Sequence, residues 1–136
     1  MQYRHTPHSV QLVNYHIVFA PRYRRQLLVG KRKKRLSEVL REVARDNGWE
    51  VIAMEVMPDH VHLFVSADTK TKPEIVVKRF KGRSSHTLRG EFPELLKMPT
   101  LWTRSYFLST AGNVSSEAIQ KYIENQWGKK FERAQE

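Results

Sequence analysis

Two histidines, His60 and His62, stand two residues apart in a segment that is typical of a β-strand. Side chains of a strand alternate between its two faces, so we expect both imidazoles on one face and Val61 on the other. This spacing lets two ring nitrogens reach one metal ion. Taken alone, the pattern favours two unrelated surface histidines. The preceding turn at Pro58-Asp59 and the fully apolar opposite face shift the interpretation towards a metal site.

A second pair of candidates lies near the C-terminus, where Tyr122 and Gln126 are one helical turn apart on the same face. The amide oxygen of Gln126 could be a third ligand of the metal, and the phenol of Tyr122 could act as a nucleophile. Helical periodicity alone instead favours a packing role for the tyrosine and a solvated glutamine.

Tyrosine suits the cutting and rejoining of DNA for a physical reason. Attack by a phenolate on a phosphodiester stores the energy of the broken bond in a phosphotyrosine, from which a freed 3′-hydroxyl can later rejoin the strand without ATP. A phenol has a pKa of about 10, so it needs a proton acceptor or a nearby cation at neutral pH. A metal bound to the phosphate oxygens would also neutralise the charge that develops at phosphorus.

The charge of the chain points to an anionic partner. Lys and Arg total 24 against 14 Asp and Glu, which gives a formal net charge of +10 over 136 residues. A positive field of this size attracts nucleic acids, with anionic membranes as the rival partner. The sequence has no apolar run long enough to span a bilayer and no signal peptide, so we expect nucleic acid rather than a membrane, and a cytoplasmic location.

The length suits one domain, residues 1–136, with one core. The chain has no cysteine, which excludes disulfides, thiolate zinc sites and a cysteine nucleophile. A metal site would therefore use imidazole, carboxylate, amide or water ligands, which favour the harder divalent ions.

The elements that must position these side chains follow from hydrophobic periodicity. We expect strands over residues 12–23, 49–57, 60–66 and 101–109, and helices over 36–47, 73–90 and about 115–131, with a loop over 92–99. The order predicts an α+β fold, a ferredoxin-like βαββαβ antiparallel sheet with both helices on one face. The other face, which would carry the imidazoles, stays open unless the C-terminal helix covers it.

Basic residues are spread over the first strand and both core helices, which suits contacts to a DNA backbone. The DNA-binding candidates are Arg22, Arg24, Arg25, Lys78, Lys81 and Arg83. Arg83 stands out because its neighbours Gly82 and two serines permit a close approach of phosphate. For the run of residues 31–35, DNA contact and a solvated helix start are equally open.

Four aromatic residues remain to be interpreted. One or more of Trp102, Tyr106 and Phe107 could stack on bases, although core packing is favoured for most of them. His16 alternates away from the apolar face of its strand. It could neighbour the pair of His60 and His62, but we interpret it as a polar residue of the open face or a DNA contact rather than as a metal ligand.

In several stretches the chain resembles the IS200/IS605-type transposases, the single-tyrosine HUH enzymes. The matching stretches are residues 56–64 (VMPDHVHLF), 81–85 (KGRSS), Trp102 through 112–114 (GNV) and 122–126 (YIENQ), together with Tyr15-His16 and the basic residues 22–25. Each motif is weak alone, but all of them occur in order, at the family's spacing, over nearly the whole chain.

The resemblance implies that His60, His62 and Gln126 bind Mg²⁺ or Mn²⁺ and that Tyr122 is the nucleophile, with a 5′-phosphotyrosine intermediate. It implies single-stranded DNA with hairpins at the element ends as the substrate. It also implies a homodimer in which the tyrosine helix of one protomer can complete the partner's site, with Gly112 as a hinge. Two alternatives remain: a domesticated HUH nuclease acting on palindromic repeats, and a non-catalytic ssDNA- or RNA-binding ferredoxin-like module.

Overall fold

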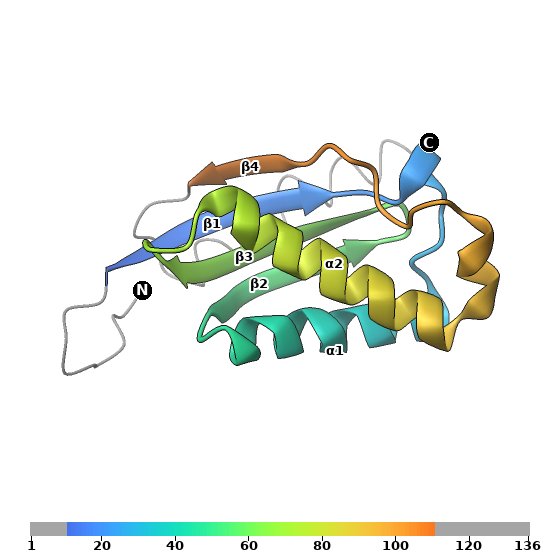
Figure 1. Ribbon diagram of the computed structural model, residues 1–136, viewed down its shortest axis with the longest axis horizontal. Coiled ribbons are helices and arrows are strands. Elements are labelled where there is room, and N and C mark those ends of the chain that lie inside the picture. Colours follow the sequence, from blue (N-terminus) through green and yellow to red (C-terminus); the bar gives the residue numbers. More distant parts are fainter. Residues whose placement is uncertain (1–10, 111–136) are drawn as a thin grey trace.

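The computed structural model describes residues 11–110, which form a four-stranded antiparallel sheet with two helices on one face (Figure 1). The strands are β1 (Leu12–Phe19), β2 (Glu50–Met57), β3 (His60–Asp68) and β4 (Phe107–Thr110), and the helices are α1 (Gly30–Asp46) and α2 (Pro73–Glu91). Short 3₁₀ turns, η1 (Arg22–Arg24) and η2 (Pro93–Lys97), complete the chain order. The predicted α+β arrangement is confirmed for these elements, whereas the expected C-terminal helix and the extent of the domain over 1–136 lie outside the described residues.

The strand order β2-β3-β1-β4 places β3 and β1 at the centre of the sheet. Every neighbouring pair is antiparallel, and β2 is joined to β3 by the tight turn at Pro58-Asp59. His62 lies opposite Val18 of β1 and Glu55 of β2, and His16 lies opposite Phe64 of β3. The candidate imidazoles are therefore held by the most constrained strands of the sheet.

One face of β3 builds the core. Val61, Leu63 and Val65 have no exposed surface and pack in one cluster with the apolar stripes of the two helices. The stripe of α1 consists of Leu36, Val39, Leu40, Val43 and Ala44. Full burial of each such aliphatic side chain stabilises the fold by roughly 1.5–3 kcal/mol. Neither helix within residues 11–110 has the length and apolarity needed to cross a membrane.

The first strand is shorter than the predicted 12–23. β1 ends at Phe19, and the chain then passes Pro21 into a 3₁₀ turn in which Tyr23 and Arg24 adopt left-handed backbone angles, with φ of 61° and 50°. Proline has no N–H to donate to a ladder, so it commonly ends a strand. The basic stretch 22–25 therefore belongs to a turn.

Three further boundaries differ from the prediction. The last strand starts at Phe107 rather than residue 101, because Leu101 and Trp102 are buried in the segment that leads to it. Helix α1 starts at Gly30, so the basic run 31–35 forms its first turns. Part of the expected loop 92–99 is the turn η2.

Two glycines give a test of the backbone. Gly82 lies within α2, and Gly48 ends α1 with φ of +73°; a Cβ at either would meet nothing within 4 Å. Gly82→Ala should raise the free energy of unfolding by about 0.5–1 kcal/mol through helix propensity. Gly48→Ala should lower it by about 1 kcal/mol, because an L-residue is strained at that φ. Urea unfolding compares them, and shifts of the same sign would contradict the assigned backbone.

Candidate functional site

The two imidazoles of β3 lie next to each other on the face of the sheet that faces away from the helices. The ring centroids of His60 and His62 are 4.8 Å apart, and the ring planes are nearly perpendicular, at 87°. His60 keeps 18% of its side chain exposed, whereas His62 is fully buried. The predicted shared face of the pair is confirmed, and this face is covered rather than open at His62, Asn14, Phe64 and Ser66, which are buried.

The ring of His60 is oriented by a carboxylate. Its Nδ1 lies 2.6 Å from Oδ1 of Asp59, and the other oxygen of Asp59 accepts a hydrogen bond of 3.0 Å from Nη2 of Arg24. Burial alone would raise the pKa of Asp59, but the hydrogen bond from His60 and the neighbouring positive charges outweigh it and leave the pKa lowered. Asp59 is therefore an anion that holds His60 by its Nδ1.

The ring of His62 is held by a different partner. Its Nδ1 lies 3.3 Å from Nε2 of His16. The His16 ring stacks almost parallel on Phe64, with centroids 4.2 Å apart. Burial lowers the pKa of His16 to about 4, so this imidazole is neutral at pH 7. His16 thus lies beside the pair, a position that its alternation along the strand allowed.

These positions suit a divalent cation in part. Both Nδ1 atoms contact protein side chains, so a cation could be coordinated only through Nε2 of each ring, an arrangement typical of metal-binding histidines. Two imidazoles are too few for a complete site. Among residues 11–110, no group of three or more His, Asp or Glu side chains could hold a metal. A complete site would need a further ligand of another kind or from outside residues 11–110.

The expected third ligand Gln126, the nucleophile Tyr122 and the hinge Gly112 lie outside the described residues. The chain nevertheless runs towards them from a defined point. β4 pairs with β1 so that Ser109 lies opposite His16 and Thr110 opposite Tyr15. The described chain therefore ends on β4, with β1 between it and the strand that carries His62.

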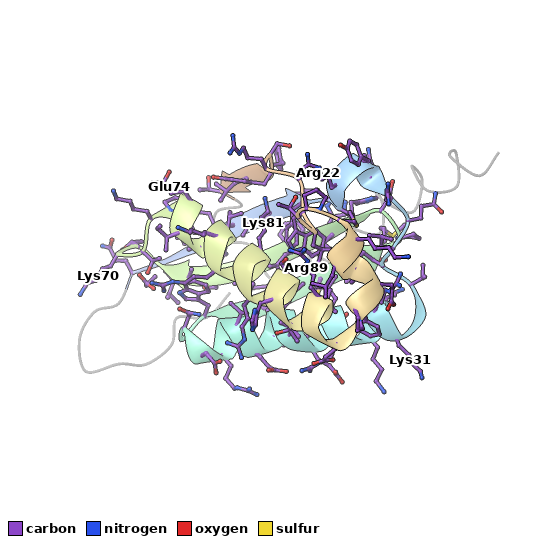
Figure 2. All side chains as sticks on the ribbon, turned by 45° about the vertical axis from the view of Figure 1, so that its right-hand side comes forward. Arg22, Lys31, Lys70, Glu74, Lys81 and Arg89 are labelled. Atoms are coloured by element: carbon purple, nitrogen blue, oxygen red, sulfur yellow. The ribbon has the colours of Figure 1, made fainter. Side chains whose placement is uncertain are left out.

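A basic groove lies on the other side of the molecule, along α2 and the segment that leads into β4. Its volume is about 910 Å³. Its cationic lining residues are Arg22, Lys78, Lys81, Arg89 and Arg104. Glu74 is the sole carboxylate among the described residues that line it. Figure 2 shows Arg22, Lys81 and Arg89 gathered along this side of α2, with Lys31 at the distant start of α1.

The six predicted DNA-binding residues divide between this groove and other surfaces. Arg22, Lys78 and Lys81 line the groove. Arg24 is paired with Asp59 near the imidazoles, and Arg25 lies over the ring of Tyr23. Arg83 instead lies 3.3 Å from Asp46 and 3.7 Å from Glu42 of α1. The residue whose small neighbours suggested a phosphate contact is therefore paired with acidic side chains.

Of the three aromatic candidates, one is a core residue and two are exposed. Trp102 is buried, and its Nε1 donates a hydrogen bond of 3.0 Å to Oγ of Ser84. Tyr106 and Phe107 are 41% and 53% exposed, so the expectation that most of these side chains pack in the core is wrong. Tyr106 lies at the groove with Nζ of Lys81 over its ring, 5.6 Å from the centroid.

Of the two partners of the histidines, Asp59 was not predicted from sequence, and His16 was predicted only as a possible neighbour. Asp59 reads as an ordinary turn residue, and only its contact with His60 distinguishes it. His16 carries one usable signal, its alternation onto the same face as His62. His16 and His62 are 46 positions apart in sequence, and their rings are neighbours because of the register between β1 and β3. A single sequence does not give this register.

An antiparallel sheet with an imidazole pair on one face and a cationic groove beside α2 defines a small α+β protein of the kind that handles nucleic acid. Residues 9–126 match the family described as "Transposase IS200 like". The chain is 41% identical over 123 residues to the ISDra2 transposase TnpA of Deinococcus radiodurans, covering 88% of each. It is 31% identical to the transposase for insertion sequence element IS200 of Salmonella typhimurium, covering 82% of this chain and 75% of that one.

Two solved structures are also similar. The crystal structure of a Deinococcus radiodurans R1 protein described as a transposase aligns with a TM-score of 0.72 and 36% identity, covering 92% of this chain and 98% of that one. A REP-associated tyrosine transposase bound to a REP hairpin aligns with a TM-score of 0.61 and 16% identity, covering 91% and 68%. The chain therefore belongs to the IS200-like transposase family, whose members act on DNA.

The lowered pKa of His16 predicts a pH dependence of folding. The folded state disfavours protonation, whereas the unfolded histidine titrates near pH 6.5, so the stabilisation is present above that pH and is lost as the pH falls towards 4. Between pH 7 and pH 5, the metal-free protein should lose about 2 kcal/mol of unfolding free energy through this residue. Urea unfolding of wild type and His16→Phe at both pH values tests this; equal losses in the two proteins would show that His16 is not responsible.

Proposed function

We propose that this chain cleaves and rejoins single-stranded DNA at insertion-sequence ends, with Tyr122 as the nucleophile. One observation carries the proposal. His60 and His62 are neighbours on one face of β3, each held at Nδ1 by its own partner, so that both Nε2 atoms are oriented to bind a cation. An ordinary surface histidine pair needs neither this burial nor these partners.

In the proposed reaction the phenol oxygen of Tyr122 attacks phosphorus, and the bond from phosphorus to the 3′-oxygen breaks. The phenolic proton leaves to a base, and the 3′-oxygen takes up a proton as it becomes a hydroxyl. The product is a 5′-phosphotyrosine and a free 3′-hydroxyl. In the reverse direction, a 3′-hydroxyl attacks this linkage, the strand is rejoined and tyrosine is released.

His60, His62 and Gln126 would hold Mg²⁺ or Mn²⁺. The ion, when bound, supplies a positive charge that offsets the negative charge on the reacting phosphate. The chain's own contribution is positional: Asp59 and His16 hold the imidazoles on a rigid central strand. Neutral imidazole and an amide oxygen leave the positive charge of the ion largely uncompensated, which favours an anionic ligand such as DNA.

The route of the chain supports a role for Tyr122. It follows Thr110 by twelve positions, a stretch that spans about 18 Å if helical and about 40 Å if extended. Because Thr110 is paired with β1 beside His16, that reach includes His62 of the same protomer. It also permits the proposed exchange within a homodimer, in which Tyr122 pivots about Gly112 into the partner's site.

We assign DNA binding away from the reacting phosphate to the basic groove. Arg22, Lys78 and Arg104 provide exposed or partly exposed cations there, and Tyr106 provides an exposed ring. Lys81 is fixed in place, because its Nζ donates a hydrogen bond of 2.6 Å to the carbonyl of Thr103. Several cations and an exposed aromatic ring in one groove suit a phosphate backbone with an accessible base. Because a relative of the same fold is bound to a REP hairpin, we propose hairpin DNA as the ligand.

Loss of the phenol oxygen tests the nucleophile. Tyr122→Phe should abolish the covalent protein–DNA adduct, because no oxygen remains to attack phosphorus, and should leave hairpin binding nearly unchanged. Incubation with single-stranded element ends and Mn²⁺, followed by a denaturing gel, measures the adduct. An adduct with the phenylalanine variant would assign the chemistry to another residue. Binding by wild type without any metal-dependent cleavage would favour a non-catalytic binding module.

Removal of one groove cation tests the assignment of the DNA surface. Lys78→Ala should weaken binding to hairpin DNA at every sequence and reduce the slope of log affinity against log salt by about 1. Lys33→Ala is the matched control, since Lys33 is also an exposed helical lysine but lies on α1, outside the groove. Fluorescence anisotropy over a salt series measures both. A larger effect at Lys33 would move the DNA surface to the basic start of α1.

A further inference from the structure

We propose that His16 is a positioning residue for His62, accepting a hydrogen bond from its Nδ1 and so presenting its Nε2 to a metal ion. The inference rests on the proposed function, in which His62 is a metal ligand. It adds His16, a residue of β1, to the proposed site, and His16 acts on the ion only through His62.

The proposed coordination through Nε2 fixes the direction of the hydrogen bond. Nε2 of His16 and Nδ1 of His62 are 3.3 Å apart, so one of them carries the proton and the other accepts it. A neutral imidazole has a single N–H, and a ring that coordinates through Nε2 must carry its proton on Nδ1. His62 is then the donor and His16 the acceptor. Metal-binding histidines regularly depend on such a partner for tautomer and orientation.

The sheet holds His16 in place for this task. In the antiparallel pairing of β1 with β3, His16 lies opposite Phe64, which makes His62 its diagonal neighbour on the same face. Its ring stacks on Phe64 at 4.2 Å and meets the ring of Phe107 edge-on at 5.6 Å. Contacts from β3 and β4 thus restrict the plane of the His16 imidazole.

His60 has a carboxylate as its acceptor and His62 has an imidazole, and this difference follows the burial of the two sites. His60, which is partly exposed, donates to the anionic carboxylate of Asp59. His62 has no exposed surface, and His16 is 6% exposed. A carboxylate at that depth would carry a large desolvation cost, whereas an imidazole supplies an acceptor without a charge. A histidine is therefore the acceptor that this buried position tolerates.

A matched pair of variants separates the hydrogen bond from the packing. His16→Phe keeps an aromatic ring on Phe64 but removes the acceptor, whereas His16→Gln loses the ring and places an amide oxygen near the position of Nε2. His86→Gln, at an exposed position of α2 outside the groove, is the control. Titration calorimetry with Mn²⁺ alone, without DNA, measures the affinity of the full chain.

We expect about 10- to 100-fold weaker Mn²⁺ binding for His16→Phe, the range seen when the outer partner of a metal ligand is lost. His16→Gln should bind at close to wild-type affinity despite its poorer packing, and His86→Gln should be unchanged. Wild-type affinity in a folded His16→Phe protein would overturn the proposal. Weaker Mn²⁺ binding by His16→Gln than by His16→Phe would also overturn it, because the affinity would then follow the packing of the ring.

A second measurement requires neither metal binding nor a folded variant protein. Long-range ¹H–¹⁵N NMR of the metal-free wild-type protein reports which nitrogen of His62 is protonated. We expect the proton on Nδ1; a proton on Nε2 would overturn the inference. If wild type failed to bind Mn²⁺ while His62 carried its proton on Nδ1, the proposed metal site would fail and the hydrogen bond from His62 to His16 would stand.

Discussion

The alternation of side chains along β3 is the constraint on which the rest of the structure depends. Val61, Leu63 and Val65 must face the helices to be buried, and this forces His60, His62 and Phe64 onto the opposite face. A slip of one residue would place imidazoles in the apolar core and valines at the site. The burial that stabilises the fold therefore also sets the geometry of the candidate metal ligands.

The imidazoles and the cationic groove lie on different sides of the sheet. On one face, the imidazoles of His60 and His62 are held in defined orientations, and the anion beside them, Asp59, is itself balanced by Arg24. On the α2 side, the groove gathers cations whose partners are chiefly backbone carbonyls, such as those of Thr103 and Met98. The candidate metal ligands and the cations of the groove thus lie on different surfaces.

The sequence predicts the elements well where burial controls them and less well where tertiary contacts do. The amphipathic stripe of α1 and the alternation of β3 specify their own structure. Residues 20–25 and 101–106 do not specify their own structure, because these two distant segments contact each other. Pro21 forms a β-bridge with Trp102, and Nε1 of Trp102 donates a hydrogen bond to Ser84. The same reasoning applies to the site. The spacing of His60 and His62 is local, whereas the contact of His62 with His16 depends on the register between two strands.

The central claim is that one divalent ion binds both imidazoles of β3. Electron spin echo envelope modulation of the Mn²⁺-loaded protein counts the coordinated imidazole nitrogens directly. The account predicts two such nitrogens in wild type and one in His60→Ala. A spectrum of the wild-type complex without imidazole nitrogens, or one unchanged by the loss of His60, would contradict it.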